Sequence, residues 1–216
     1  DYGVYAFDAV DGVLDHSYAT GSPDAGFYIG QCYPCDAIVN NVVSEYNGLG
    51  YSGTNSGGSL YITSSIFRNN KGGLAPNTLD SELLPPERET FIIGNLIENN
   101  NNYNSPATNS TYLSYGNGVV IAGGNNNIIK NNVIVDHDLY GVILTASMDV
   151  NYWPAHGNRV EENLILSSRK ADIAVSGVSN LANCFEGNYF NTSIPPGLQA
   201  LNGCEKNIIP LSADLS

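Results

Sequence analysis

The sequence is poor in charge, and above all in basic charge. Charged residues make up 13% of its 216 residues, whereas a typical globular domain has about 25%. Only 8 Lys and Arg accompany 21 Asp and Glu, so the formal net charge is -13 at pH 7. This leaves too few basic residues for the positive stripe that phosphate binding requires, and it excludes a nucleic-acid partner.

The acidity also bears on other partners. It disfavours docking on anionic membranes and repels an acidic polysaccharide, unless a local basic cluster or a bridging cation such as Ca²⁺ intervenes. The simpler alternative is that the charge keeps an extracellular protein in solution.

Long apolar runs and helical periodicity are missing as well. No run reaches membrane-spanning length and no signal peptide is present, so we expect a soluble chain without membrane insertion. No long window places apolar residues at the spacing of an amphipathic helix. The polarity comes from Asn, Ser, Thr, Tyr and 23 Gly, a composition that suits short strands and tight turns.

An internal repeat is present instead. An Asn precedes a pair of β-branched or aromatic residues at several places, and Ser65 and His16 complete the series. Successive members are 24 to 37 residues apart, and a Gly followed by apolar residues recurs between them, at Gly26, Gly118 and Gly141. The five members with Asn are Asn41, Asn95, Asn132, Asn163 and Asn188.

A unit of this length cannot close its own core, but stacked coils can share one. The repeated Asn side chains would then bond from coil to coil, which gives them a structural role. An antiparallel sandwich is the alternative fold. The motif favours the solenoid, because it repeats in the same order instead of mirroring.

Residues 131–144, Asn-Asn-Val-Ile-Val-Asp-His-Asp-Leu-Tyr-Gly-Val-Ile-Leu, resemble the repeat of the pectate-lyase-like superfamily of right-handed parallel β-helix proteins. Within it the chain is most similar to bacterial secreted members of unassigned activity. The resemblance implies an all-β, right-handed parallel β-helix of about seven coils. It implies little about activity, because the superfamily includes lyases, hydrolases, epimerases, tailspikes and adhesins.

We expect the β-helix to span residues 1–190 and a capping tail to span 191–216. The chain opens as a strand already under way, so we also expect further coils before residue 1.

Function in solenoids usually lies where loops interrupt the coils. Three insertions are expected, at residues 75–90, 99–117 and 145–158. The first and third fall between the Gly-led strand and the Asn-bearing strand, so they should form two walls around a low turn at 122–126. This notch is the predicted site; its walls carry Asn77, Asp80, Glu82, Glu87 and Arg88 on one side and Asp149, Tyr152, Trp153 and His156 on the other.

Two kinds of chemistry are open at the notch. Tyr152 and Trp153, with Asn125 on the floor, could bind a sugar by stacking, or Trp153 could fold back and pin its own loop. Asp80, Glu82, Arg88 and His156 are weak catalytic candidates, the carboxylates as acid and base or as oxygen ligands of Ca²⁺. The alternative is that these loop carboxylates are only solvated.

Asp136-His137-Asp138 superficially resembles the Asp-Pro-His element of alginate epimerases. The proline is absent, however, and the segment occupies the place of an ordinary turn in other coils. We therefore expect a structural histidine.

The four cysteines form two local pairs, Cys32 with Cys35 and Cys184 with Cys204. An even count in this composition indicates two disulfides and export to a secreted, extracellular or cell-surface location. The second pair would cap the final coil. Two glycosylation sequons begin at Asn109 and Asn191.

Two functions remain open. The first is an extracellular β-helix that binds polysaccharide, and as an enzyme would be a lyase, hydrolase or epimerase. The second is a non-enzymatic component of an envelope or filament, whose partners are neighbouring protein subunits.

Overall fold

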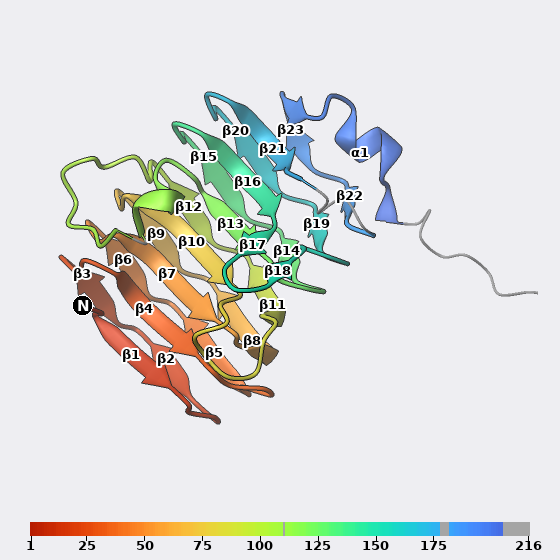
Figure 1. The fold of residues 1–216 in the computed structure, drawn as a ribbon. Coiled ribbons are helices and arrows are strands. Elements are labelled where there is room, and N and C mark those ends of the chain that lie inside the picture. Colours follow the sequence, from red (N-terminus) through yellow and green to blue (C-terminus); the bar gives the residue numbers. More distant parts are fainter. Residues whose placement is uncertain (110, 178–181, 205–216) are drawn as a thin grey trace, which may run out of the picture.

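The structure is a computed structural model that describes residues 1–109, 111–177 and 182–204. Three parallel sheets run along its length and form the sides of a solenoid (Figure 1). Sheet A contains β1 (Val4–Phe7), β4 (Ala25–Gly30), β7 (Leu49–Thr54), β10 (Gly72–Asn77), β13 (Val119–Ala122), β16 (Tyr140–Thr145), β21 (Ala171–Val175) and β24 (Ser193–Ile194).

The other two sheets have seven strands each. Sheet B contains β2 (Val13–Asp15), β5 (Ala37–Asn40), β8 (Gly57–Thr63), β11 (Arg88–Ile93), β14 (Ile128–Lys130), β19 (Arg159–Glu161) and β22 (Cys184–Glu186). Sheet C contains β3 (Tyr18–Thr20), β6 (Val43–Glu45), β9 (Ile66–Arg68), β12 (Leu96–Glu98), β15 (Val133–Val135), β20 (Leu164–Leu166) and β23 (Tyr189–Phe190).

Each coil contributes one strand to each sheet, in the order A, B, C. Neighbours within a sheet are therefore equivalent strands of successive coils, and every pair in the three sheets is parallel. Seven complete coils are present, with β24 beginning an eighth. The predicted right-handed parallel β-helix of about seven coils is confirmed.

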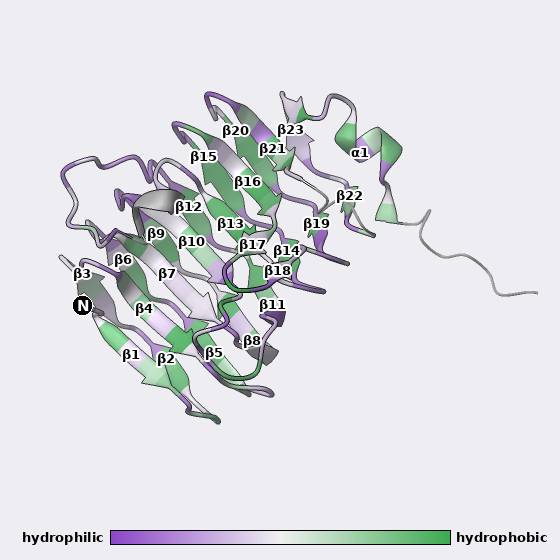
Figure 2. Cartoon of the chain, in the orientation of Figure 1, coloured by the Kyte–Doolittle hydropathy of each residue, from purple (hydrophilic) through white to green (hydrophobic). Residues whose placement is uncertain are grey.

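The core is a set of apolar rows inside the prism. Residues point alternately inward and outward along each strand, and parallel register stacks the inward residues of successive coils. Figure 2 shows hydrophobic residues concentrated in the strands and hydrophilic ones in the turns. One fully buried row, in sheet B, consists of Val39, Ile62, Ile92, Ile129, Val160 and Phe185.

The predicted asparagine ladder is present at the bend before sheet C. The Oδ1 of Asn132 accepts hydrogen bonds from the backbone N–H and the Nδ2 of Asn95, at 2.9 and 3.0 Å. Asn163 accepts the same pair from Asn132, and Asn188 accepts it from Asn163. Each Nδ2 also donates to a carbonyl of the preceding coil, which satisfies these buried amides.

Asn41 was expected in this ladder, and the expectation is wrong. Strand register places Val42, not Asn41, opposite Ser65. Asn41 occupies the preceding turn position, where its φ is 50° and the equivalent Asn131 has a φ of 56°. Asn adopts this left-handed conformation at low cost, so turns and ladders in this chain use the same residue type.

Two further ladders, which the sequence analysis did not identify, occupy the other bends. One joins Asn47, Asn70 and Asn100. The other joins Asn127, Asn158 and Asn183. All three bends of the solenoid are thus held together by buried side-chain amides.

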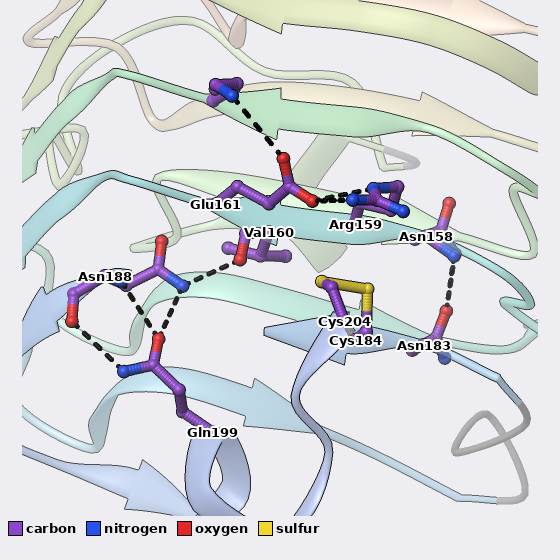
Figure 3. Close-up of a disulfide and its surroundings, with 10 residues drawn as sticks. Asn158, Arg159, Val160, Glu161, Asn183, Cys184, Asn188, Gln199 and Cys204 are labelled. Atoms are coloured by element: carbon purple, nitrogen blue, oxygen red, sulfur yellow. Dashed lines mark hydrogen bonds and ion pairs between the residues drawn. A yellow bond between two sulfur atoms is a disulfide. The ribbon is translucent and has the colours of Figure 1, made fainter. Parts of the chain in front are cut away.

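The C-terminal end of the described chain is closed by a short helix, α1 (Leu198–Leu201). Leu198 packs into the core, and the Oε1 of Gln199 accepts hydrogen bonds from the backbone N–H and the Nδ2 of Asn188, so that it takes the next place in the ladder (Figure 3). The Cys184–Cys204 disulfide ties this segment to β22. The rest of the predicted capping tail, residues 205–216, lies outside the described residues.

The insertions lie at opposite ends of the strands of sheet A. Residues 78–87 and 146–158 follow the C-terminal ends of β10 and β16, and the second of these forms an antiparallel hairpin of β17 (Ser147–Met148) and β18 (Tyr152–Trp153). Residues 99–118 precede β13 and contain the 3-10 helix η1 (Thr111–Ser114). Loops therefore flank sheet A at both ends of its strands. No helix in the described ranges is long and apolar enough to cross a membrane.

Candidate functional site

A groove of about 400 Å³ lies over the outer face of sheet A. Its floor is formed by the outward residues of β7, β10 and β13. The first insertion forms one wall with Leu79 and Glu82, and η1 forms the opposite wall with Thr111 and Ser114. The remaining lining comes from Tyr2, Asp24, Leu49, Ser52, Thr54, Ala75, Asn77, Val120, Ala122 and residues 145–148.

The floor is flat because its side chains are small and in register. Thr54 pairs with Asn77, and Asn77 with Ala122, so one row crosses three coils. The Oγ1 of Thr54 donates a 3.1 Å hydrogen bond to Oδ1 of Asn77, whose Nδ2 donates to the carbonyl of Ala75 at 2.8 Å. These bonds fix the orientation of the polar groups on the floor.

Stacked aromatic rings form the end of this face nearest the N-terminus. Tyr5 of β1 pairs with Tyr28 of β4, and their ring centroids are 4.9 Å apart. Tyr2 lies 4.8 Å from Tyr5 and 4.7 Å from Tyr28, and Phe7 stacks on the other side of Tyr5. Tyr5 and Phe7 are 53% and 38% exposed, whereas Tyr28 is fully buried at 1%. We call Tyr2, Tyr5, Phe7 and Tyr28 the aromatic platform.

The platform and the groove floor belong to a single row. Tyr5 pairs with Tyr28, Tyr28 with Ser52, and Ser52 with Ala75. Adjacent members of such a row are about 4.8 Å apart. An extended ligand that runs along the solenoid axis would therefore pass from the exposed ring of Tyr5, over the buried Tyr28, onto a floor of small residues.

Two carboxyl groups face the groove beside the platform. Tyr28 donates its hydroxyl proton to Oε1 of Glu82 at 2.6 Å. Partial burial raises the pKa of Glu82, and the hydrogen bond from Tyr28 opposes the rise. Burial likewise raises the pKa of Asp24, against a hydrogen bond from Tyr2. Both groups hold a proton more strongly than a solvated carboxylate does, which suits them to general acid chemistry.

Hydrogen bonds attach each wall of the groove to residues of other coils. On the η1 side, the N–H of Thr108 and the Oγ1 of Thr111 both donate to the carbonyl of Pro23, at 3.0 and 3.3 Å. The second insertion thus reaches back to the turn before β4 and stands against the start of the groove. On the other side, Asn55 donates to the carbonyls of Leu79 and Glu82.

The first and third insertions, which were expected to flank an open notch, contact each other. The N–H of Asp80 donates to Oδ2 of Asp149 at 2.9 Å. Asp80 in turn accepts hydrogen bonds from the backbone and side chain of Asn151 and, at 3.2 Å, from Nε1 of Trp153. Trp153 therefore holds its own loop against the first insertion, while Tyr152 is 44% exposed beside it.

Two parallel β-bridges connect the backbones of three predicted site residues in successive coils, Arg88, Asn125 and His156. Their side chains do not line the groove. The Arg88 guanidinium lies 3.7 Å from the centroid of the Tyr33 ring and donates to the carbonyl of Pro86. Of the predicted catalytic candidates, only Glu82 lines the groove.

Glu87, which was also placed on a wall of the notch, is fully buried under the first insertion. It accepts hydrogen bonds from Oγ1 of Thr90 and from Nδ2 of Asn127, both at 2.8 Å. Desolvation raises its pKa to about 8. Glu87 is thus hydrogen-bonded to the ladder of Asn127, Asn158 and Asn183 and is shielded from solvent.

His137 is 1% exposed and follows Asn100 in the ladder at the bend before sheet A. Burial lowers its pKa to about 3, so it is neutral at ordinary pH. The structural histidine expected from the sequence is what the geometry shows.

Both predicted disulfides are confirmed, Cys32–Cys35 and Cys184–Cys204. Within the described ranges, one cluster has potential metal-ligating groups, formed by Glu161, Cys184 and Cys204. Its cysteines are bonded to each other and have no thiolate to offer, and the Glu161 carboxylate binds Arg159 and Lys130 (Figure 3). Both sequon residues, Asn109 and Asn191, are exposed.

Sequence analysis missed Tyr2, Asp24 and Tyr28, which shape one end of the groove. A signal was available for the aromatic residues. Tyr5 and Tyr28 each stand two positions after a Gly that begins a strand segment, as Ser52 and Ala75 do. Alignment of these glycines would have placed the four side chains in one outward row.

No protein-family model and no curated protein sequence matches the chain. Three chains among the solved structures match it. One is the A-module of the mannuronan C-5 epimerase AlgE4 from Azotobacter vinelandii, with a TM-score of 0.48 and 15% sequence identity. The match covers 84% of this chain and 56% of that one, so the chain spans little more than half of the neighbour's length. At this identity the similarity concerns the fold alone.

Proposed function

We propose that the protein is an extracellular β-helix that binds a polysaccharide in the groove over sheet A. The observation that carries the proposal is the continuous row in which the exposed ring of Tyr5 leads, past the buried Tyr28, onto Ser52 and Ala75 of the groove floor. Aromatic ring faces pack against the apolar faces of sugar rings, and a floor of small side chains leaves room for the next sugars.

The groove has the other properties of a glycan site. Its volume of about 400 Å³ is in the range of small-ligand pockets. Hydrogen bonds fix the orientation of three of its polar groups, the Thr54 hydroxyl, the Asn77 amide and the Glu82 carboxyl. The two disulfides support an oxidising, extracellular location. We therefore propose that the chain acts outside the cell, as do secreted members of the superfamily that its repeat resembles.

Glu82 is the residue through which the groove would process a glycan. Partial burial raises its pKa and so favours the protonated form, which is the form that donates a proton to a glycosidic oxygen. Incubation of the protein with a panel of neutral and uronate glycans would reveal such an activity as new products. The Glu82→Gln variant, which lacks an ionisable group, should form none.

Binding is tested with purified protein on the same panel by calorimetry, before and after Tyr5→Ala. Tyr5 is exposed and its removal opens no core cavity, so a loss of affinity reports on stacking. We expect a loss of roughly tenfold, the size of one aromatic stacking contact. Tyr189→Ala is the matched control, because Tyr189 is 66% exposed on sheet C, away from the groove.

Two results would contradict the proposal. One is that no glycan binds, and the other is that Tyr5→Ala and Tyr189→Ala have equal effects. Either would favour the structural alternative, in which the solenoid pairs with neighbouring protein subunits.

A further inference from the structure

We infer that the groove over sheet A is selective for glycans without carboxylate groups, so that its substrate class is neutral polysaccharide and not polyuronate. The inference rests on the proposed function and concerns the charge of the site that the proposed function uses.

The charged residues that line the groove are all acidic in the described chain. Asp24 and Glu82 line it, whereas no Lys, Arg or His is among its lining residues in the described chain. A site that binds a sugar carboxylate needs a cationic group to neutralise it. Here the bound sugar would instead meet two acidic groups beside the aromatic platform.

The basic residues of the described chain are engaged elsewhere. Lys71 donates to the carbonyl of Tyr103 beneath the second insertion, and Lys170 lies over the ring of Tyr140. Arg88 stacks on Tyr33. The other four form ion pairs outside the groove: Arg68 with Glu45, Lys130 with Glu162, Arg159 with Glu161 and Arg169 with Asp138.

The partial burial of the two carboxyls strengthens the selection. Like charges in a partly desolvated site repel strongly because little water screens them. A uronate would therefore have to enter with Asp24 and Glu82 protonated. The net charge of -13 adds a long-range repulsion that slows the approach of any polyanion.

A neutral sugar brings no charge to these carboxyls. The Oε2 of Glu82 is buried and has no hydrogen-bond partner in the described chain, while its Oε1 is occupied by the hydroxyl of Tyr28. Because solvent does not reach Oε2, the charge of an ionised Glu82 is poorly screened. A uronate carboxylate nearby is repelled, whereas a sugar hydroxyl is not.

The test uses matched pairs of oligosaccharides that differ only in the carboxylate. Oligomers of galacturonan, mannuronan and glucuronan are compared with their carboxyl-reduced counterparts, which keep the same linkages, by calorimetry at pH 7 with EDTA. We expect Tyr5-dependent binding of at least one reduced oligomer, and at least tenfold weaker binding of its uronate partner.

A variant tests the cause. Glu82→Gln keeps an oxygen that can accept the Tyr28 hydrogen bond but removes the charge, so it should reduce the difference between the partners several-fold. Glu186→Gln, on sheet B and outside the groove, should leave the difference unchanged. A further arm replaces EDTA with CaCl₂, and we expect the reduced oligomer still to bind more tightly.

The outcomes are distinct. Uronate binding that depends on Tyr5 and equals or exceeds that of the reduced partner, with EDTA or with Ca²⁺, overturns the inference and leaves the proposed function standing. A difference that Glu82→Gln leaves undiminished also overturns it. An absence of Tyr5-dependent binding in all three pairs overturns the proposed function, and the inference with it.

Discussion

The hydroxyl of Tyr28 donates a 2.6 Å hydrogen bond to Oε1 of Glu82, a residue 54 positions later in the chain. The bond joins the second coil to the first insertion and holds a carboxyl group at the junction of the aromatic platform and the groove. Both the proposed processing of a glycan and the selection by charge depend on this carboxyl, so its protonation equilibrium is the first property to measure.

Replacement of Tyr28 by Phe should raise the pKa of Glu82. Desolvation already raises this pKa, and the Tyr28 hydroxyl opposes the rise by stabilising the carboxylate. Phe keeps the ring and its stacking but removes that donor. A carbon-13 NMR titration of the side-chain carboxyl of Glu82 measures the change. Tyr18→Phe is the control, because Tyr18 donates to Glu45 and should affect only that residue; an unaltered Glu82 in Tyr28→Phe would contradict the prediction.

The regular part of the fold could be predicted from the sequence because one physical constraint recurs in every coil. Inward positions must be apolar, bends must satisfy buried amides, and the Gly near the start of most sheet A segments has no room for a side chain, although β21 has Asp172 at this position. A Cβ on Gly73, for example, would clash with the carbonyl oxygen of Gly118. These local requirements leave a pattern in each repeat, and they define the number of coils and the ladder from Asn95 onward.

The site was harder to predict because it depends on where loops fold back. The insertions were found, but their mutual contacts are not a property of the repeat. Thr111 reaches Pro23 across 88 residues, and Trp153 reaches Asp80 across 73. The sequence analysis paired the first insertion with the third. The groove forms between the first and the second, which lie at opposite ends of the strands of sheet A, and the start of the third, residues 145–148, also lines it.

Glu87 should make the stability of the protein depend on pH. Its pKa is about 8 in the folded state, against 4.5 for an ordinary Glu, which approximates the unfolded chain. Between these values the folded state binds more protons than the unfolded state, so stability falls as pH rises through this window. The slope approaches 1.4 kcal/mol per pH unit for a single group. Above pH 8 the contribution becomes constant.

Glu87→Gln removes this dependence. Gln can keep an oxygen toward Nδ2 of Asn127 and turn its amide group to the hydroxyl of Thr90, and it carries no charge to desolvate. Arg88 and Tyr51 also interact electrostatically with Glu87, and both remain. Urea denaturation at pH 5, 7 and 9 should show the variant gaining relative stability as pH rises, whereas Glu186→Gln should follow the wild type. A variant that is less stable than the wild type at pH 9 would refute the assignment.

Asn132→Ala should destabilise the protein far more than its small change in volume suggests. The substitution leaves the backbone N–H and the Nδ2 of Asn95 without their acceptor, and the carbonyl of Ile92 without its donor. Because all of these groups are buried, we expect a loss of about 3 kcal/mol in the free energy of unfolding. Chemical denaturation measures it, and Asn104→Ala, at an exposed loop position, should cost little. Equal effects would mean that the ladder adds no stability.

The only tryptophan of the chain reports on the contact between the first and third insertions. Trp153 donates its indole N–H to Oδ1 of Asp80, and Asn151 donates to both oxygens of the same carboxylate. Asp80→Ala removes all three hydrogen bonds and should release the β17–β18 hairpin into solvent.

The expected result is a red shift of tryptophan emission and stronger quenching by acrylamide. Asp149→Ala is the matched control, since it removes a contact between the same two loops but leaves the indole bonded to Asp80, so its emission should change much less. If Asp80→Ala leaves emission and quenching unaltered, Trp153 is not held by this contact. Its ring would then be available for stacking on a ligand, as the open-notch hypothesis required.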